Sequence, residues 1–399
     1  MVVNVQEKIS IRNPNELLTH KRLDVVIKYL YASNLSSDYY QNSYKEHLKV
    51  WNNFYEGNTP QKHGFEDFDN AFKSILNNVV DEPVPVNPEG HIANGAHRLA
   101  AALYHQRLIN ARDTYQNENY PIHADYRFFK KRKLSDHIIK RAAAEYAKLK
   151  SNTHVVCLFP IAHSRINEVM EIINEYSNIF YHSTVELNAV GQLGLMKEIY
   201  FVEGWANEEG IQRKGNQCFR GESKVTFVLI DAKDLETVKE MKAKIRKLFN
   251  VGNHSVHISD FHEDAIRIAK TVFNDNSIRF LNYRKNVSFP KYKEFIASAK
   301  PDDNTIITGS SVLSLYGLRD CKDLDLIYGK NAPADSHNQY LETHYNLSLD
   351  EIINDPRCHL YYQGFKYVSL DVIKNMKISR NEPKDIADVK LIETVKGFK

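Results

Sequence analysis

Apolar side chains in the first part of the chain recur mainly at the three-to-four-residue spacing of amphipathic helices. Residues 14–32 begin with Pro14, which suits the first turn of a helix, and continue with this spacing. Further helices are expected over residues 66–77 and 97–105, and a basic helix over 129–150. The pattern therefore predicts a first segment that is rich in helices.

Two stretches of this segment have a different pattern. Residues 32–64 are polar and rich in tyrosine and asparagine, which indicates an insertion. Residues 83–95 contain proline and glycine between short apolar runs, and they read as a strand, a turn and a second strand. The segment thus adds a small amount of sheet to its helices, and we place its end near residue 150.

The middle of the chain alternates between apolar runs and amphipathic stretches. The apolar runs are expected to be buried strands, and the amphipathic stretches to be helices. The expected strands are 155–159 and 225–230, and the expected helices are 164–176, 235–249 and 262–273. Such a mixture is typical of an α/β domain.

The last segment follows a linker and again contains both kinds of element. Strands are expected at 305–308, 324–328 and 367–373, and helices at 291–299, 310–317 and after the last strand. The predicted fold class is therefore a multidomain chain with α/β and α+β parts. Its expected domains are residues 1–150, 151–286 and 287–399.

The composition fits a globular protein of two or three domains. The 399 residues are 42% hydrophobic and 26% charged, and the net charge is +3. A charge this close to zero argues against a nucleic-acid partner. Because no stretch is long and apolar enough to span a membrane and no signal peptide is visible, we expect a cytoplasmic protein without a membrane partner.

The cysteines give no sign of a disulfide framework or a zinc site. They are Cys157, Cys218, Cys321 and Cys358, and no two of them form a CxxC pair. This usage fits a reducing compartment.

A candidate catalytic motif lies in the last segment. Gly309 and Ser310 separate a predicted strand from a predicted helix, and Asp323 and Asp325 follow on the next predicted strand. Side chains two positions apart on a strand point to the same face, so the two carboxylates would share one site while the leucine after each faces the core. Carboxylates suit Mg²⁺, and the backbone N–H groups of a Gly-Ser turn suit a triphosphate.

This arrangement resembles the polymerase-beta-like nucleotidyltransferase superfamily over roughly residues 290–399. That family combines a Gly-Ser turn, a helix and an acid-x-acid strand with a third carboxylate on a later strand. The resemblance implies Mg²⁺ or Mn²⁺ at Asp323 and Asp325, where two ions could assist an in-line displacement. It also implies an NTP, either ATP or CTP, at Gly309 and Ser310.

The third carboxylate of the expected metal cluster would be Asp371, because it lies on a predicted strand. It would complete the cluster or activate the acceptor. Arg380, Lys384 and Asp385 follow and are candidates for the rim of the site. The alternatives are an inactive relative with the same fold, or an ordinary strand whose acids face water.

A second motif lies in residues 83–105 and opens a predicted helix. It contains Asn94, Gly95, His97 and Arg98. Glycine allows a sharp turn at the start of a helix, whose free N–H groups attract phosphate. The guanidinium of Arg98 would add a fork of hydrogen-bond donors, and His97 a further donor. The alternative is that His97 and Arg98 only brace the helix.

The second motif resembles the ParB/sulfiredoxin-like fold, over about residues 8–105. The resemblance implies a site for ATP, ADP or CTP at the four motif residues. Ala96 stands where a sulfiredoxin has its cysteine, and Leu99 stands where the DNA-partition proteins have a second arginine. With the sulfiredoxin and DNA-partition functions discounted, the interpretation that remains is a kinase-like activity. Its general base would be Glu16 or Glu89.

The middle segment contains a group of acids and histidines that could bind a metal ion. The group comprises His254, His257, Asp260, His262 and Glu263. We favour a strand that leads into a helix capped by Ser259 or Asp260. His257 and His262 could still line a substrate site.

Together the two resemblances predict an enzyme that transfers a nucleotidyl group from Mg-NTP to a small-molecule acceptor. The acceptor would be a phosphorylated sugar or polyol, and the N-terminal domain would act as a kinase, as in the synthesis of cell-surface polysaccharide precursors. The alternative is a regulatory or toxin-type nucleotidyltransferase that acts on tRNA or protein, with a ParB-like module that senses CTP or ATP. Neither the base preference nor the oligomeric state follows from the sequence.

Overall fold

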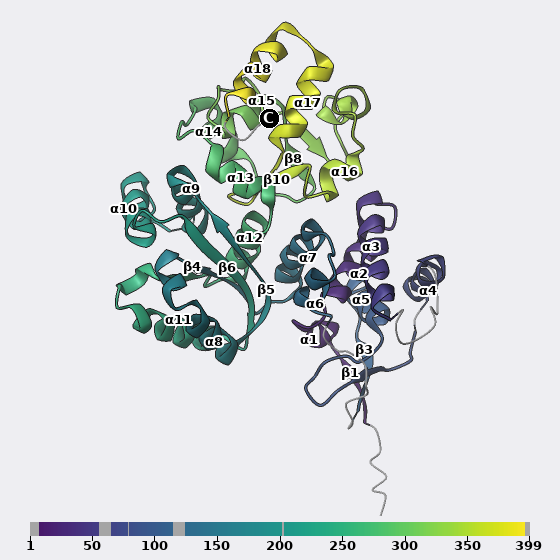
Figure 1. Cartoon of the computed structure of the whole chain (residues 1–399). Coiled ribbons are helices and arrows are strands. Elements are labelled where there is room, and N and C mark those ends of the chain that lie inside the picture. Colours follow the sequence, from purple (N-terminus) through teal and green to yellow (C-terminus); the bar gives the residue numbers. More distant parts are fainter. Residues whose placement is uncertain (1–7, 56–64, 79, 115–123, 202, 396–399) are drawn as a thin grey trace, which may run out of the picture. The chain divides into compact units, whose positions relative to one another are not determined.

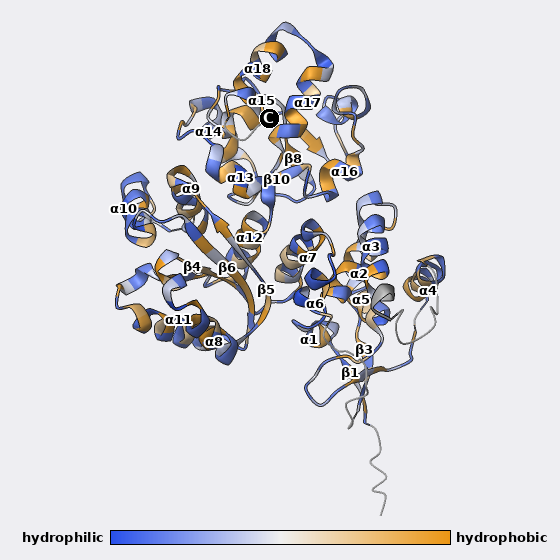
Figure 2. Ribbon diagram, in the orientation of Figure 1, coloured by the Kyte–Doolittle hydropathy of each residue, from blue (hydrophilic) through white to orange (hydrophobic). Residues whose placement is uncertain are grey.

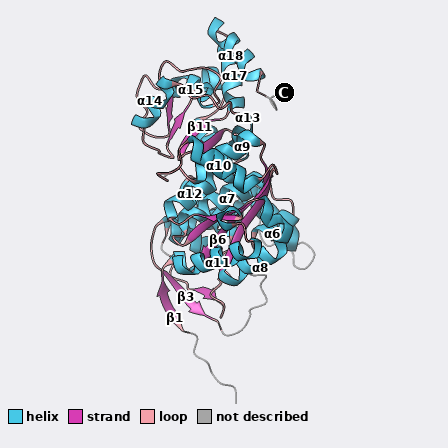
Figure 3. Cartoon of the chain, turned by 90° about the vertical axis from the view of Figure 1, so that its left-hand side faces the viewer, coloured by secondary structure: helices cyan, strands magenta, loops and turns pink. Residues whose placement is uncertain are grey.

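The structure is a computed structural model that describes residues 8–55, 65–78, 80–114, 124–201 and 203–395. Helices and short strands alternate along these residues, so the mixed α/β class is confirmed (Figure 3). None of the described helices is long and apolar enough to cross a membrane. The chain forms two compact units: unit 1 runs to Ser151 and includes Asn178–Tyr181, and unit 2 comprises Asn152–Ser177 and the chain from His182.

Unit 1 combines helices with a three-stranded sheet of order β1-β3-β2. Figure 1 labels β1 and β3 of this sheet. Strand β3 pairs antiparallel with β1 and parallel with β2. Its elements are β1 (Ile9–Arg12), α1 (Pro14–Leu17), α2 (Leu23–Ser33), α3 (Asp38–Tyr55), α4 (Phe65–Asn77), β2 (Val84–Val86), α5 (Ala96–Tyr104), β3 (Ile109–Asp113), α6 (Tyr126–Lys131) and α7 (Asp136–Leu149).

Helix α2 forms the centre of unit 1 and packs against α3, α5 and α7. The stretch expected as a polar insertion is in part the helix α3, whose Tyr39, Tyr44 and Leu48 are buried. A polar composition therefore concealed an amphipathic helix with an aromatic inner face. The second strand expected after β2 is reduced to a single bridge between Val86 and Ile92.

The first part of unit 2 contains a four-stranded sheet of order β5-β6-β4-β7. Strand β4 is antiparallel to both of its neighbours. The elements of this part are β4 (Thr153–Leu158), η1 (Pro160–Arg165), α8 (Ile166–Tyr176), β5 (Ser177–Glu186), α9 (Ala189–Ile199), α10 (Glu208–Phe219), β6 (Lys224–Ala232), α11 (Leu235–Phe249), η2 (Gly252–His254), β7 (Val256–Ile258), α12 (His262–Val272) and α13 (Asp275–Tyr283).

The connectivity of this sheet is that of a split βαβ motif, in which helices follow the first and third strands. Helices α9 and α10 are inserted between the second and third strands. The helices carry a hydrophobic and a hydrophilic side, as expected for elements that cover a sheet (Figure 2). The predicted cap of α12 is wrong: its N-cap residue is Phe261, whereas the Ser259 hydroxyl accepts a hydrogen bond from the N–H of Val155.

The second part of unit 2 has a sheet of order β10-β11-β8-β9. Strand β8 is antiparallel to β9 and parallel to β11, and β10 and β11 form a hairpin. The elements are α14 (Pro290–Ser298), β8 (Thr305–Ile307), α15 (Gly309–Leu315), β9 (Leu326–Tyr328), η3 (His337–Tyr340), η4 (Leu341–Tyr345), α16 (Leu349–Asn354), β10 (His359–Tyr362), β11 (Phe365–Val368), α17 (Leu370–Arg380) and α18 (Pro383–Glu393).

Candidate active site

The turn between β8 and α15 brings Gly309 against a carboxylate. Gly309 has a φ of +60°, and a Cβ atom built on it would lie 2.0 Å from Oδ2 of Asp325. Only glycine combines this backbone conformation with so close an approach. Residues Gly309 and Asp325, which the sequence placed in one site, are therefore in direct contact.

Backbone hydrogen bonds hold Asp325 beside this turn. The N–H of Thr308 donates to the carbonyl oxygen of Asp325 at 2.9 Å, and the N–H of Ser310 donates to its carboxylate. Asp323 and Asp325 immediately precede β9, whereas the sequence predicted them within the strand. The leucines next to them, Leu324 and Leu326, are half-buried, and the buried side chain of this segment is Ile327.

A chain of hydrogen bonds leads from the carboxylate of Asp325 into the core. Nε2 of His337 lies 3.0 Å from Oδ1 of Asp325, and Nδ1 of His337 lies 3.0 Å from the Tyr345 hydroxyl. That hydroxyl lies 2.6 Å from Oγ1 of Thr308. A proton on Nε2 of His337 is donated to Asp325, and the hydroxyls of Tyr345 and Thr308 continue the chain of hydrogen bonds from Nδ1.

These contacts keep Asp325 ionised. Burial alone would raise the pKa of its carboxyl group, but the hydrogen bonds from His337 and Ser310 and the charge of Arg380 outweigh burial and lower that pKa. A buried carboxylate that is held by donors on one side is a typical metal or cation ligand on the other.

Asp323 has the opposite environment. Its side chain is exposed and makes no hydrogen bond or ion pair with any residue in the described ranges. Its carbonyl oxygen accepts a hydrogen bond from the Ser311 hydroxyl at 3.1 Å, which fixes the backbone of Asp323 at the start of α15. The side-chain hydroxyl of Ser310 likewise has no partner among the described residues. Two polar groups therefore remain available at the turn.

The strand predicted for Asp371 is wrong. Strand β11 ends at Val368, and Asp371 lies in the first turn of α17. Its carboxylate forms an ion pair with Arg279, with an oxygen–nitrogen distance of 2.5 Å. Ser369 occupies the N-cap position of α17 without a capping hydrogen bond from its hydroxyl, so the helix begins directly after β11 and includes Asp371.

No set of three or more histidine, cysteine, aspartate or glutamate side chains in the described part of the chain is arranged to hold a metal ion. The three acids expected to share one metal site, Asp323, Asp325 and Asp371, thus do not form such a set. The middle-segment histidines and acids do not form one either.

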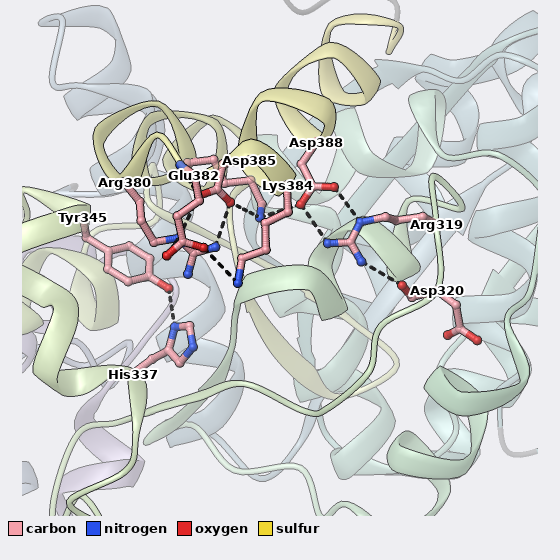
Figure 4. A network of polar contacts seen from close by, with 10 residues as sticks. Arg319, Asp320, His337, Tyr345, Arg380, Glu382, Lys384, Asp385 and Asp388 are labelled. Carbon is pink, nitrogen blue, oxygen red and sulfur yellow. Dashed lines mark hydrogen bonds and ion pairs between the residues drawn. The ribbon is translucent and has the colours of Figure 1, made fainter.

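The expected rim residues belong to a network between α17 and α18 (Figure 4). Asp385 is fully buried and pairs with Arg380 at 2.7 Å and with Lys377 at 3.1 Å. Lys384 pairs with the exposed Glu382 at 3.0 Å. The charges of Arg380 and Asp385 therefore hold two helices together, and Arg380 also contributes its field to Asp325.

The same network anchors the loop that leads to the candidate carboxylates. Arg319 follows α15 and binds Asp388 through two nitrogens, at 2.6 and 2.7 Å. Lys377 also contacts Asp388, through Oδ2 at 2.6 Å. A bidentate arginine–carboxylate pair fixes orientation as well as distance. Helices α17 and α18 thereby position the segment before Asp323.

In unit 1, the second motif forms the expected turn at a helix start. Gly95 has a φ of +87° and caps α5, and a Cβ there would lie 2.6 Å from the side chain of Val84. The side-chain oxygen of Asn94 accepts the hydrogen bond of the Gly95 N–H at 2.7 Å. The glycine is therefore required by the close packing of α5 on β2.

The side chains after this turn point into the protein. Nε2 of His97 lies 2.7 Å from the Tyr44 hydroxyl, and burial lowers the pKa of the imidazole well below its ordinary value. Arg98 is buried and donates to the carbonyl oxygen of Glu82 at 2.8 Å, while its guanidinium also pairs with the Glu82 carboxylate. Both contacts fit the bracing role that the sequence left open.

His337 and Tyr345 were missed at the sequence level. They lie in the short helical turns η3 and η4, 12 and 20 positions after Asp325, where no periodic pattern marks them. The only available signal was a histidine and a tyrosine close together in a polar loop downstream of the acidic pair. Their meeting with Asp325 and Thr308 is a tertiary contact.

Comparison with known proteins assigns no family to this chain: no protein-family model matches it, and no curated protein or solved structure is similar enough to be matched.

Proposed function

We propose that the turn at Gly309 binds a nucleoside triphosphate and that the protein transfers its nucleotidyl group to a small-molecule acceptor. The main support is the contact between the Gly309–Ser310 turn and Asp325, next to the carboxylate of Asp323, which has no partner among the residues that the structure describes. The turn and the two acids come from different elements. The side chain of Asp323 makes no described contact that would explain its presence there by stability alone.

The donor set fits a magnesium ion. Asp323 and Asp325 supply carboxylate oxygens and Ser310 a hydroxyl, which are hard ligands that leave room for water and phosphate. A bound Mg²⁺ would supply neutralisation of the triphosphate and of the leaving pyrophosphate. His337 fixes the orientation of the Asp325 carboxylate, and Asp323 remains free to turn toward an incoming ligand.

The decisive experiment measures pyrophosphate release with each of the four ribonucleoside triphosphates, in the presence of Mg²⁺ and a small-molecule extract. We expect release by the native protein and a loss of about a hundredfold or more in Asp323→Asn and Asp325→Asn, since each removes a metal ligand. Asp335→Asn is the matched control, because Asp335 is an exposed acid of the same region.

Two outcomes would refute the proposal. One is an absence of pyrophosphate release by the native protein with every nucleotide, both with Mg²⁺ and with Mn²⁺. The other is equal loss in the Asp335→Asn control. The variant Asp371→Asn decides separately whether the helix residue contributes, and we expect little effect because its carboxylate is bound to Arg279.

A further inference from the structure

A cluster of cationic side chains lies in the split βαβ part of unit 2. Lys214 comes from α10, and its Nζ lies 5.9 Å from the centre of the Tyr200 ring, which contacts His257 on β7. Lys242 and Arg246 come from α11, which packs against β7, and the charges of all three cations lower the pKa of His257. Burial is the largest cause of that shift, which brings the pKa to about 3. His257 is thus a neutral, half-buried imidazole beside three cationic side chains.

Several polar groups of this cluster have no internal partner. Arg246 makes no hydrogen bond or ion pair with any described residue, and its Nε atom is completely buried. The ring nitrogens of His257 and the hydroxyl of Tyr200 also have no hydrogen-bond partner among the described residues. The rings of Tyr200 and His257 are in edge contact, with centroids 4.9 Å apart. A buried donor without an acceptor is destabilising, so it is rarely retained without a use.

The positive charges are only partly compensated. Lys242 pairs with Asp260 at 3.2 Å, and Lys214 donates to the carbonyl oxygen of Asn253 at 2.8 Å. Glu203 is another carboxylate near Tyr200, and it is exposed. Among the described residues, the three cations Lys214, Lys242 and Arg246 are therefore balanced by one directly paired carboxylate, that of Asp260. Unlike Arg246, the nearby Arg267 is fully engaged, by Glu198 and Asp264.

From this convergence we propose that Lys214, Arg246 and His257 form a binding site for the phosphate groups of a small phosphorylated molecule. An arginine fork, an ammonium group and a neutral imidazole that donates one proton match the oxygens of a phosphate. The Tyr200 hydroxyl adds a donor, and its ring forms an apolar wall that strengthens the charge interactions. The site lies apart from the Gly309 turn in the sequence and the fold, and it does not depend on the function proposed there.

The test is equilibrium binding of inorganic pyrophosphate to the full chain in EDTA, measured by titration calorimetry. Without divalent ions, the Asp323–Asp325 pair has no metal through which to attract the probe. We expect the native protein to bind, and Arg246→Ala to weaken binding about tenfold or more, because a charge-assisted contact is lost. The matched control is Lys247→Ala, which removes an exposed charge from the next position of α11.

Stability separates a binding role from a structural one. Because Arg246 has no partner, Arg246→Ala should leave the thermal midpoint unchanged or raise it, as repulsion between cations decreases. A lower midpoint, absence of pyrophosphate binding by the native protein, or equal weakening in Lys247→Ala would overturn the proposal. A single-stranded oligonucleotide that binds more tightly than pyrophosphate and is lost in Arg246→Ala would overturn the small-molecule assignment.

Discussion

At the scale of single residues, the candidate site depends on one glycine and one oriented carboxylate. Gly309 permits an approach that no side chain would allow, and His337 holds the carboxylate of Asp325 from the opposite side. Both effects are local in space, and each can be measured through the stability of the protein even before its substrate is known.

The glycine at the turn should be far less replaceable than another glycine with the same backbone angle. Gly309 and Gly252 both have a φ of +60°, but nothing lies within 4 Å of a Cβ at Gly252. We expect Gly252→Ala to cost about 1 kcal/mol from the backbone alone. Gly309→Ala should cost about 2 kcal/mol more, because it displaces Asp325. Urea denaturation measures both, and equal losses would contradict the close approach.

The ionised state of Asp325 should make a pH-dependent contribution to stability. Its pKa is lower in the folded protein than the ordinary value of 3.8, so its contribution is complete above that value and is lost as the pH falls through the folded pKa. We therefore expect Asp325→Asn to be less stable than the native protein by about 1 kcal/mol at neutral pH. The difference should shrink at a pH of about 3. Urea denaturation at both pH values is the measurement, and a constant difference would disprove the shift.

At the scale of elements, the helices α17 and α18 are joined by buried charge. Lys377, Asp385 and Asp388 are each nearly inaccessible to solvent, and Arg380 and Arg319 complete their interactions. A buried ion pair adds little net stability, but loss of one partner leaves a charge uncompensated. The packing of α17 against α18 should therefore be specific in orientation, and it should be sensitive to the loss of any one of these charged side chains.

Lys377 should be much more important to stability than a nearby lysine on the same helix. In Lys377→Met, the carboxylates of Asp385 and Asp388 lose a shared partner, and we expect a cost of about 3 kcal/mol. Lys374 pairs with the half-exposed Glu393, so Lys374→Met should cost about 0.5 kcal/mol. Chemical denaturation compares the two variants. Similar losses would mean that the network is not coupled to the packing of the helices.

At the scale of the whole molecule, the chain forms two compact units with separate cores. The first is built around α2, and the second contains two sheets with their covering helices. Units of this kind often unfold independently, so that one midpoint does not describe the protein. We therefore expect the two units to unfold in separate transitions.

Calorimetry should resolve two unfolding transitions. The variant Lys377→Met should lower the midpoint of one transition and leave the other unchanged, because Lys377 belongs to the second unit. The variant Tyr44→Phe, which removes the hydrogen bond to His97 in the first unit, should affect the other transition. One transition that both variants shift together would show that the units unfold as a single cooperative body.

Local patterns in the sequence were sufficient for most elements and for part of the site. Helices such as α8, α11 and α12, and the strands β4, β6 and β8, follow from apolar periodicity. The positions of the Gly-Ser turn and of the acidic pair are visible in the sequence, and the family resemblance implied that they share one site. The direct contact between Gly309 and Asp325 joins two different elements and comes from the tertiary fold.

Tertiary structure decided the rest. Asp371 lies in the first turn of α17 and pairs with Arg279, a partner 92 positions earlier in the chain that the local apolar pattern could not indicate. His337 and Tyr345 reach Asp325 only through the tertiary placement of η3 and η4. Arg246 has no hydrogen-bond or ion-pair partner within the described part of the chain, where α11 packs against β7. The sequence by itself determined the elements and the turn, because short-range sterics and periodicity act there. Only the folded chain determined which charges are paired, because pairing depends on contacts between distant segments.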